Sequence, residues 1–387
     1  MSRAEIYLDY AATSPIDPAV AAAITECLTH EFGNPSSQHA AGKRARRLVE
    51  AAREAIGARV GAPAERLVFT SGATESNNLA LHGVLKRSRG RAVHLVTSRI
   101  EHKSVLDVAR ALQANGVAVT YVPSTAGGYV EPERVIAAIT ADTQLVSIMH
   151  VNNETGVIQD IARIGAGCRE RGVLFHVDAA QSAGKLPLDL AAWPVDLCSL
   201  TAHKLCGPKG VGALYVAPRV TLLPQIQGGE QERGLRAGTL ATPQIVGMGK
   251  AYELADPARE APRLAALRDR LWQALRPISG VRQNGDPSRR APHVLNVAFP
   301  GVEGESLRFE LRDLAVSAGS ACAADSPEAS HVLTGIGLSD TLAASSLRFS
   351  VGRFTTDEEV VAAATRVEAG VARLRALAKS APPWCSG

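Results

Sequence analysis

The chain has 387 residues, of which 46% are hydrophobic and 21% charged, and its formal net charge at pH 7 is +4. This length exceeds the usual size of one domain, and the ordinary composition excludes a disordered or low-complexity protein. The slight charge gives no reason to expect direct nucleic-acid binding, and no apolar run is long enough to span a bilayer, so we expect a cytoplasmic protein that uses no membrane.

Short apolar runs alternate with helical patterns between about residues 65 and 217. Their hydrophobicity is continuous rather than alternating, which is typical of parallel strands covered on both faces. We predict seven strands, at 67–70, 93–97, 118–122, 145–151, 174–178, 196–200 and 212–216. The helices between them are predicted at 75–86, 103–115, 133–139 and 161–171.

The pattern changes after a glycine-rich segment at 227–238. The C-terminal third of the chain indicates a second, smaller α+β domain. Within this third we predict helices at 243–254, 263–275 and 357–377 and strands at 294–299, 315–317 and 346–351. We therefore expect a large domain at 15–255 and a small domain at 1–14 and 256–387, which carries Cys322.

Two of the predicted strands end at side chains that can take part in catalysis. One ends on Asp178, and the other leads into Thr201, His203 and Lys204. Pyridoxal phosphate chemistry needs such a pair, since a lysine holds the aldehyde as a Schiff base and an acid keeps the pyridine nitrogen protonated. Strand alternation would place Thr201 and His203 on one side, toward a phosphate, and Lys204 on the other.

The segment SGATESNN, at Ser71–Asn78, follows a strand and opens a helix. Ala73 and Thr74 would present backbone N–H groups and a hydroxyl at the positive end of that helix, which suits a phosphate. An ordinary helix cap is the alternative. Thr239, which precedes a later helix, is a further candidate phosphate contact, reached across a dimer interface.

Four more polar side chains lie in or after predicted strands. His102 suits stacking on a flat cofactor and proton transfer, although a surface histidine at a helix start is the alternative. Asn153 and Gln181 are candidate donors to the cofactor's phenolic oxygen, and Asn153 equally suits the substrate carboxylate or a simple turn. The Arg348 guanidinium suits a substrate α-carboxylate, with a surface ion pair as the alternative.

Six cysteines without paired spacing argue against a disulfide framework, and the sequence predicts no metal site. Cys322 lies among small residues in SAGSAC, which is typical of an exposed, reactive thiol, with a structural cysteine in a turn as the alternative. Cys27, Cys168 and Cys198 are expected in the core, and Cys206 is expected to be buried near the site.

Taken together, these motifs resemble the NifS/IscS-like cysteine desulfurases, which are class-V aminotransferases among the fold-type I pyridoxal phosphate enzymes. The resemblance runs almost from end to end and includes, in family order, YLDYAATSP, FGNPSSQH, SGATESNN, EHKSV, HVNNETG, HVDAAQS, TAHKLCGPKG, RAGTL, SAGSAC and LRFSVGRFT. It implies an α/β fold with a mostly parallel seven-stranded sheet in a large domain, a smaller α+β domain, and a homodimer.

The resemblance also implies an activity: the removal of sulfur from L-cysteine, which gives L-alanine and a Cys322 persulfide that passes to a sulfur-acceptor protein. In that reading Lys204 is the Schiff-base lysine, Asp178 meets the pyridine nitrogen, and His102 stacks on the ring and moves protons. The other implied contacts are Gln181 and Asn153 to the cofactor, Ala73, Thr74, Thr201 and His203 to its phosphate, Thr239 from the partner subunit, and Arg348 to the substrate carboxylate.

The chain departs from the family pattern at two places, with Thr201 where serine is frequent and His331 where an aromatic residue is frequent. Other functions fit part of the pattern. An ordinary aminotransferase would not need Cys322, and a selenocysteine lyase would act on a related substrate. A sulfur-carrier scaffold finds support in the basic cluster at 43–47, which a solvated helix face also explains. The acceptor, in iron–sulfur cluster assembly, tRNA thiolation or another sulfur-containing cofactor, stays open.

Overall fold

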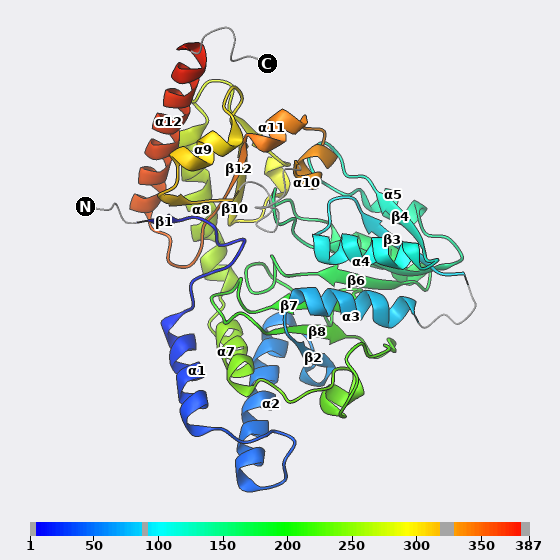
Figure 1. Ribbon diagram of the computed structural model, residues 1–387. Coiled ribbons are helices and arrows are strands. Elements are labelled where there is room, and N and C mark those ends of the chain that lie inside the picture. Colours follow the sequence, from blue (N-terminus) through cyan, green and yellow to red (C-terminus); the bar gives the residue numbers. More distant parts are fainter. Residues whose placement is uncertain (1–4, 87–91, 318–328, 381–387) are drawn as a thin grey trace.

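Figure 1 shows the computed structural model, which describes residues 5–86, 92–317 and 329–380. Its larger part is built on a seven-stranded sheet in the order β2-β8-β7-β6-β5-β3-β4. All neighbours from β7 to β4 pair in parallel, whereas β8 is antiparallel to β7 and to β2. The prediction of a mostly parallel seven-stranded sheet is confirmed. The strands are β2 (Leu67–Thr70), β3 (His94–Ser98), β4 (Ala118–Val122), β5 (Thr143–Met149), β6 (Leu174–Asp178), β7 (Leu197–Thr201) and β8 (Gly212–Val216).

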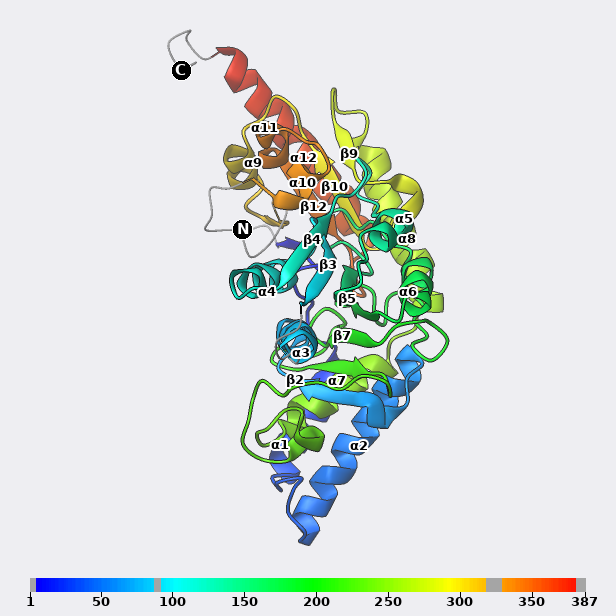
Figure 2. The same cartoon turned by 90° about the vertical axis from the view of Figure 1, so that its right-hand side faces the viewer.

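Helices cover both faces of this sheet, as Figure 2 shows. Helices α3 (Ala73–Leu85) and α4 (Lys103–Ala114) pack on one face, and α2 (Ala40–Val60), α5 (Pro132–Ala137), α6 (Ile161–Glu170) and α7 (Thr242–Glu253) pack on the other. Side chains alternate between the two cores, so Leu95 packs with the first set and Val96 with the second. Burial on both faces explains why the strands are apolar at nearly every position.

The smaller part has its own core. A three-stranded antiparallel sheet in the order β12-β10-β9 packs against two long helices that lie side by side in Figure 1. The strands are β9 (Arg282–Asn284), β10 (Val294–Ala298) and β12 (Ser346–Ser350). The helices are α8 (Pro257–Leu275) and α12 (Asp357–Ser380), with the shorter α9 (Gly304–Glu310). The short helices α10 (His331–Gly335) and α11 (Asp340–Ala344) pack instead in the core of the larger part, through Val332, Leu333 and Ala343.

The N-terminal segment joins the smaller part before the chain enters the larger one. Strand β1 (Ile6–Tyr7) pairs in parallel with β11 (Leu314–Ala315), and Ile6 and Leu8 pack in the core of the smaller part. Helix α1 (Pro18–His30) then leads to α2 at the lower end of the molecule in Figure 1. The domain limits at 15 and 255 stay a prediction.

Most predicted elements differ from their predicted limits by one to three residues, and α8 differs by more. Helix α8 begins at Pro257 rather than at residue 263, because Asp256 caps it by accepting a hydrogen bond from the Arg259 N–H. Strand β11 ends at Ala315, two residues before its predicted end. Within the described ranges, no helix combines the length and the apolar composition needed to cross a membrane.

Candidate active site

A cavity of about 470 Å³ opens where the strands of the large sheet reach their carboxyl ends. Segments that follow β2, β3, β5, β6 and β7 supply its walls, as expected for a ligand site of an open α/β sheet. The predicted site residues that line it are Ala73, Thr74, His102, Asn153, Asp178, Gln181, His203 and Lys204. Side chains from widely separated parts of the chain therefore meet in one place.

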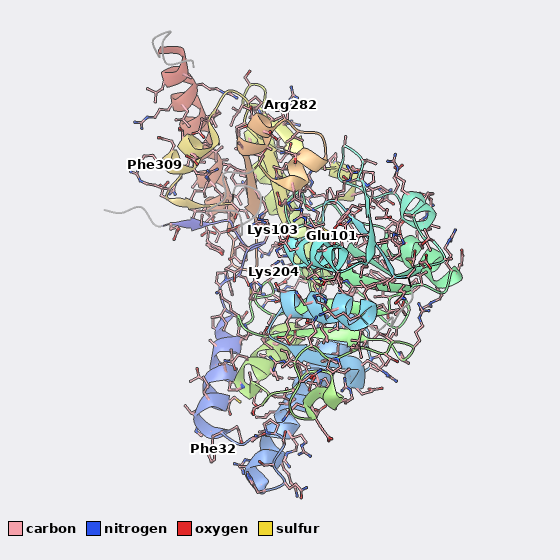
Figure 3. All side chains as sticks on the ribbon, turned by 45° about the vertical axis from the view of Figure 1, so that its right-hand side comes forward. Phe32, Glu101, Lys103, Lys204, Arg282 and Phe309 are labelled. Atoms are coloured by element: carbon pink, nitrogen blue, oxygen red, sulfur yellow. The ribbon has the colours of Figure 1, made fainter. Side chains whose placement is uncertain are left out.

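Lys204 lies in a turn beyond the end of β7, in the middle of the molecule (Figure 3). The turn contains Cys206 in a left-handed conformation with φ 58°, and the Cys206 N–H donates to Ser14 Oγ at 2.7 Å. The alternation predicted for Thr201, His203 and Lys204 is wrong, because the strand ends at Thr201. His203 and Lys204 both line the cavity, and Thr201 is not among its lining residues.

Asp178 is the last residue of β6 and is 7% exposed. Its Oδ1 accepts from the Ala180 N–H at 2.9 Å, and its Oδ2 accepts from Asn77 Nδ2 at 2.8 Å. Both donors are neutral, so they orient the carboxylate without neutralising it. A buried carboxylate that faces a cavity favours a cationic ligand group such as a protonated ring nitrogen.

His102 starts helix α4, where its ring Nδ1 accepts from the Ser104 N–H at 3.1 Å. Burial and the nearby Lys204 lower the pKa of His102 below its ordinary value, so the ring is neutral at pH 7. His203 is also neutral, because burial and Lys204 lower its pKa to about 4. Gln181 Nε2 donates to the Ala11 carbonyl at 2.8 Å and keeps a second hydrogen for a ligand.

The wall at the start of α3 is built for an anion. Gly72 caps this helix without a side-chain hydrogen bond, and a Cβ at Gly72 would meet no atom within 4 Å, so space is open beside the first turn of α3, whose N–H groups have no intrahelical partners. Lys209 lines the same cavity. Glu75, in the first turn, pairs instead with Arg236 at 3.0 Å.

Twelve buried side-chain polar atoms of the described residues lack a hydrogen-bond partner, and two of the twelve belong to predicted cofactor contacts. These two are the Thr201 hydroxyl oxygen and Asn153 Oδ1. A buried hydroxyl without an acceptor costs free energy that a bound phosphate oxygen would recover. Together with Lys204, Asp178 and the open start of α3, these atoms fit pyridoxal phosphate.

Arg348 is 1% exposed, so the alternative of a surface ion pair is wrong. Its Nη2 donates to Asp9 Oδ1 at 2.8 Å and to Ser317 Oγ at 3.1 Å, and its Nη1 donates to the Asn153 carbonyl at 2.8 Å. Arg348 does not line the cavity but lies directly behind Asn153, which does. Its role toward a substrate carboxylate stays a prediction.

The remaining predicted residues lie elsewhere. Thr239 is exposed in the segment before α7 and does not line this cavity, and Cys322 lies outside the described residues. His331 Nε2 lies 2.9 Å from the Glu101 carbonyl oxygen. Within the described ranges, no group of three or more His, Cys, Asp or Glu side chains is placed to hold a metal ion.

Four cysteines are described, and all are buried and free: Cys27, Cys168, Cys198 and Cys206. Burial of these thiols was predicted and is confirmed. Burial also raises their pKa values, to about 12 for Cys168, which keeps them protonated and unreactive.

Among the polar groups that sequence reasoning missed are Lys209 and Ser104, which line the cavity, and Asn77, which donates to Asp178. Lys209 belongs to the GPKG turn, where Gly210 adopts φ 81° and turns the chain back. Asn77 lies three residues after Thr74, a spacing that puts both on one side of α3, and this signal was available in the sequence.

Comparisons with known proteins agree with this geometry. The model of the family "Aminotransferase class-V" matches residues 6–362. Cysteine desulfurase IscS of Aeromonas hydrophila is 52% identical over 98% of this chain and 95% of its own length. The solved structure of a NifS-like protein superposes with a TM-score of 0.90 at 34% identity, covering 96% of this chain and 100% of the other. The structure titled SspA in complex with cysteine gives a TM-score of 0.82 at 38% identity, covering 90% and 99%. This chain therefore belongs to the class-V aminotransferase family, among its pyridoxal-phosphate-dependent cysteine desulfurases.

Proposed function

We propose that this desulfurase converts L-cysteine to L-alanine, holds the sulfur as a persulfide on Cys322, and passes it to a sulfur-acceptor protein. The observation that carries the proposal is the meeting of Lys204, Asp178 and His102 in one cavity. We further propose that the enzyme is a cytoplasmic homodimer in which Thr239, exposed in one chain, contacts the cofactor phosphate of the other.

Pyridoxal phosphate, when bound, supplies an aldehyde for Schiff-base formation and a ring that withdraws electrons from the substrate. The Lys204 amine would hold the aldehyde, and the Asp178 carboxylate would accept from the ring nitrogen. Ala73, Thr74, Thr201 and His203 would bind the phosphate. Gln181 and Asn153 would donate to the phenolic oxygen, and the neutral His102 ring would stack on the cofactor.

The sulfur transfer balances without an external oxidant or reductant. The Cys322 thiolate attacks the substrate sulfur, an S–S bond forms, and the substrate Cβ–S bond breaks. Cβ keeps the electron pair and gains a proton, which makes the methyl group of alanine. The sulfur then remains on Cys322 as a persulfide, a reversible thiol modification.

The site of sulfur transfer is tested by assaying alanine and protein-bound persulfide after L-cysteine is added to purified enzyme. We expect wild type and Cys27→Ser to form both products, since Cys27 is a buried thiol on α1. We expect Cys322→Ser to form neither and Lys204→Ala to lose the visible absorbance of the bound cofactor. Full alanine formation by Cys322→Ser would refute the proposed role of Cys322.

The oligomeric state is tested by sedimentation of the holoenzyme, where a dimer is expected. Thr239→Ala should weaken cofactor retention without changing the sedimentation coefficient. A monomer that is fully active at all concentrations would refute the proposed contact across subunits.

A further inference from the structure

Two predicted cofactor contacts, His102 and Asp178, are joined by a chain of hydrogen bonds through two residues that have no assigned role. Asn77 Nδ2 donates to Asp178 Oδ2 at 2.8 Å and to Ser104 Oγ at 2.8 Å. Ser104 Oγ in turn lies 2.8 Å from His102 Nδ1. Asn77 is fully buried and Ser104 is 8% exposed, so water does not compete for these bonds.

The direction of each hydrogen bond in this series is fixed by groups that can only donate or only accept. An ionised Asp178 carboxylate only accepts, so the Asn77 amide must direct its N–H groups toward Asp178 and Ser104. Since Ser104 Oγ accepts from Asn77, its own hydrogen is free to donate to His102 Nδ1.

A backbone hydrogen bond independently fixes the protonation of the same nitrogen, His102 Nδ1. His102 caps helix α4, and the Ser104 N–H donates to His102 Nδ1 at 3.1 Å. An N–H cannot accept, so Nδ1 must carry the lone pair. The ring proton of neutral His102 therefore lies on Nε2, for which the described residues provide no hydrogen-bond partner. His102 lines the cavity, so Nε2 is the nitrogen left to meet a ligand.

We propose that Asn77 and Ser104 are positioning residues that hold His102 as the tautomer with its proton on Nε2 and tie its orientation to the Asp178 carboxylate. This inference rests on the proposed function, in which Asp178 contacts the ring nitrogen of the cofactor and His102 stacks on its ring. A change in the hydrogen bonding of the Asp178 carboxylate would then reach the histidine through Asn77 and Ser104.

The charges around His102 come from several elements: Lys204 beyond β7, Asp178 on β6, His331 on α10 and Asp107 on α4. Substitution of Ser104 removes none of these charged groups. A donor to Nδ1 favours the neutral ring, so loss of the Ser104 hydroxyl raises the pKa of His102.

The first test replaces the serine. In Ser104→Ala we expect the acid limb of the pH profile of alanine formation to move to higher pH by about 0.5 to 1 pH unit, which corresponds to one lost hydrogen bond. Ser104→Thr keeps a hydroxyl and should restore the wild-type profile. Ser147→Ala is the matched control, because Ser147 Oγ makes the same 2.8 Å contact to a buried ring, His176 Nδ1, away from the cavity.

The second test does not depend on turnover. Asn77→Ala removes one donor from Asp178 and one from Ser104, so we expect the holoenzyme to lose pyridoxal phosphate about tenfold more readily on dialysis. The pH titration of the cofactor absorbance should shift in the same direction in Asn77→Ala and Ser104→Ala. The two shifts should be less than additive in the double variant, because both substitutions interrupt the same series of hydrogen bonds.

An unshifted pH profile and an unshifted cofactor titration in Ser104→Ala, as in Ser147→Ala, would overturn the inference, as would fully additive shifts in the double variant. Failure of the proposed function has a different signature. Wild-type protein would then form no alanine from L-cysteine, while the cofactor titrations of the variants would still differ.

Discussion

One buried ion pair ties the large sheet to the segment that precedes α7, and its loss has a calculable effect. Arg53 on α2 and Glu232 have side chains that are 4% and 2% exposed, and they form two hydrogen bonds, of 2.9 Å and 2.8 Å. Glu232 Oε2 also accepts from the Phe69 N–H on β2 at 2.6 Å. The Glu232→Gln variant keeps the shape but leaves the guanidinium buried without its counter-charge.

Removing one partner of a buried pair costs about 3–5 kcal/mol. For 387 residues, an unfolding entropy of about 2.1 cal/mol/K per residue converts this into a fall of about 4–6 °C in the thermal midpoint. The assay is calorimetry of the cofactor-loaded enzyme at pH 7.

Glu50 offers a matched control, because it also pairs with Arg53, at 3.1 Å, but is 52% exposed. Glu50→Gln should cost no more than about 1 kcal/mol, or roughly 1 °C. Equal midpoints for Glu232→Gln and Glu50→Gln would refute the argument that burial decides the cost.

Three further outcomes are expected from buried groups. Burial raises the pKa of Glu101 to about 8, so folding takes up a proton between pH 4.5 and 8. The free energy of unfolding should therefore fall as pH rises through this interval, by up to ~1.4 kcal/mol per pH unit. In Glu101→Gln, urea midpoints should lack this part of the pH dependence. Burial lowers the pKa of His150 to about 4, so stability present above pH 6.5 is lost as pH falls toward 4; His150→Asn should lose less over that interval in the same assay. A Cβ on Gly304 would lie 1.9 Å from the Ala344 carbonyl oxygen, so Gly304→Ala should lower the free energy of unfolding in urea by about 3 kcal/mol. A Cβ on Gly335 would lie 3.6 Å from its nearest atom, so Gly335→Ala should lower it by less than about 1 kcal/mol. Equal losses in the two variants would contradict the steric argument.

The sequence was sufficient for the sheet and for much of the cavity, because both depend on local patterns. Strands buried on both faces are apolar at nearly every position, so their limits were predicted closely. Asp178 lies directly at the end of such a strand, and parallel strands gather their carboxyl ends at one edge.

The turn that carries Lys204 shows where local reasoning fails. Cys206 adopts φ 58°, although left-handed conformations are usually marked by glycine or asparagine. The conformation is held by tertiary contacts, in which Cys206 N donates to Ser14 Oγ and its carbonyl accepts from the Asp17 N–H. Residues nearly 200 positions away therefore decide how the chain turns after Thr201.

Long-range pairs were equally beyond reach. Arg348 and Asp9 are 339 positions apart, and no periodicity relates them. The sequence placed Arg348 in a strand, which is correct, but its burial results from the packing of β12 between β10 and the N-terminal segment. A buried guanidinium requires a counter-charge, so the arginine indicates a partner without identifying it.

The charge distribution of the cavity determines how a ligand lies in it. The start of α3 and Lys209 make one part favourable to a phosphate, whereas Asp178 favours a positive ring nitrogen. Asn77 connects the two parts, because it lies four residues after Ala73 on α3 and donates to Asp178. About 6 Å of helix separates these positions. The same helix thus positions groups at both ends of the cavity, and its rigidity, rather than the strength of any one contact, fixes the distance between them.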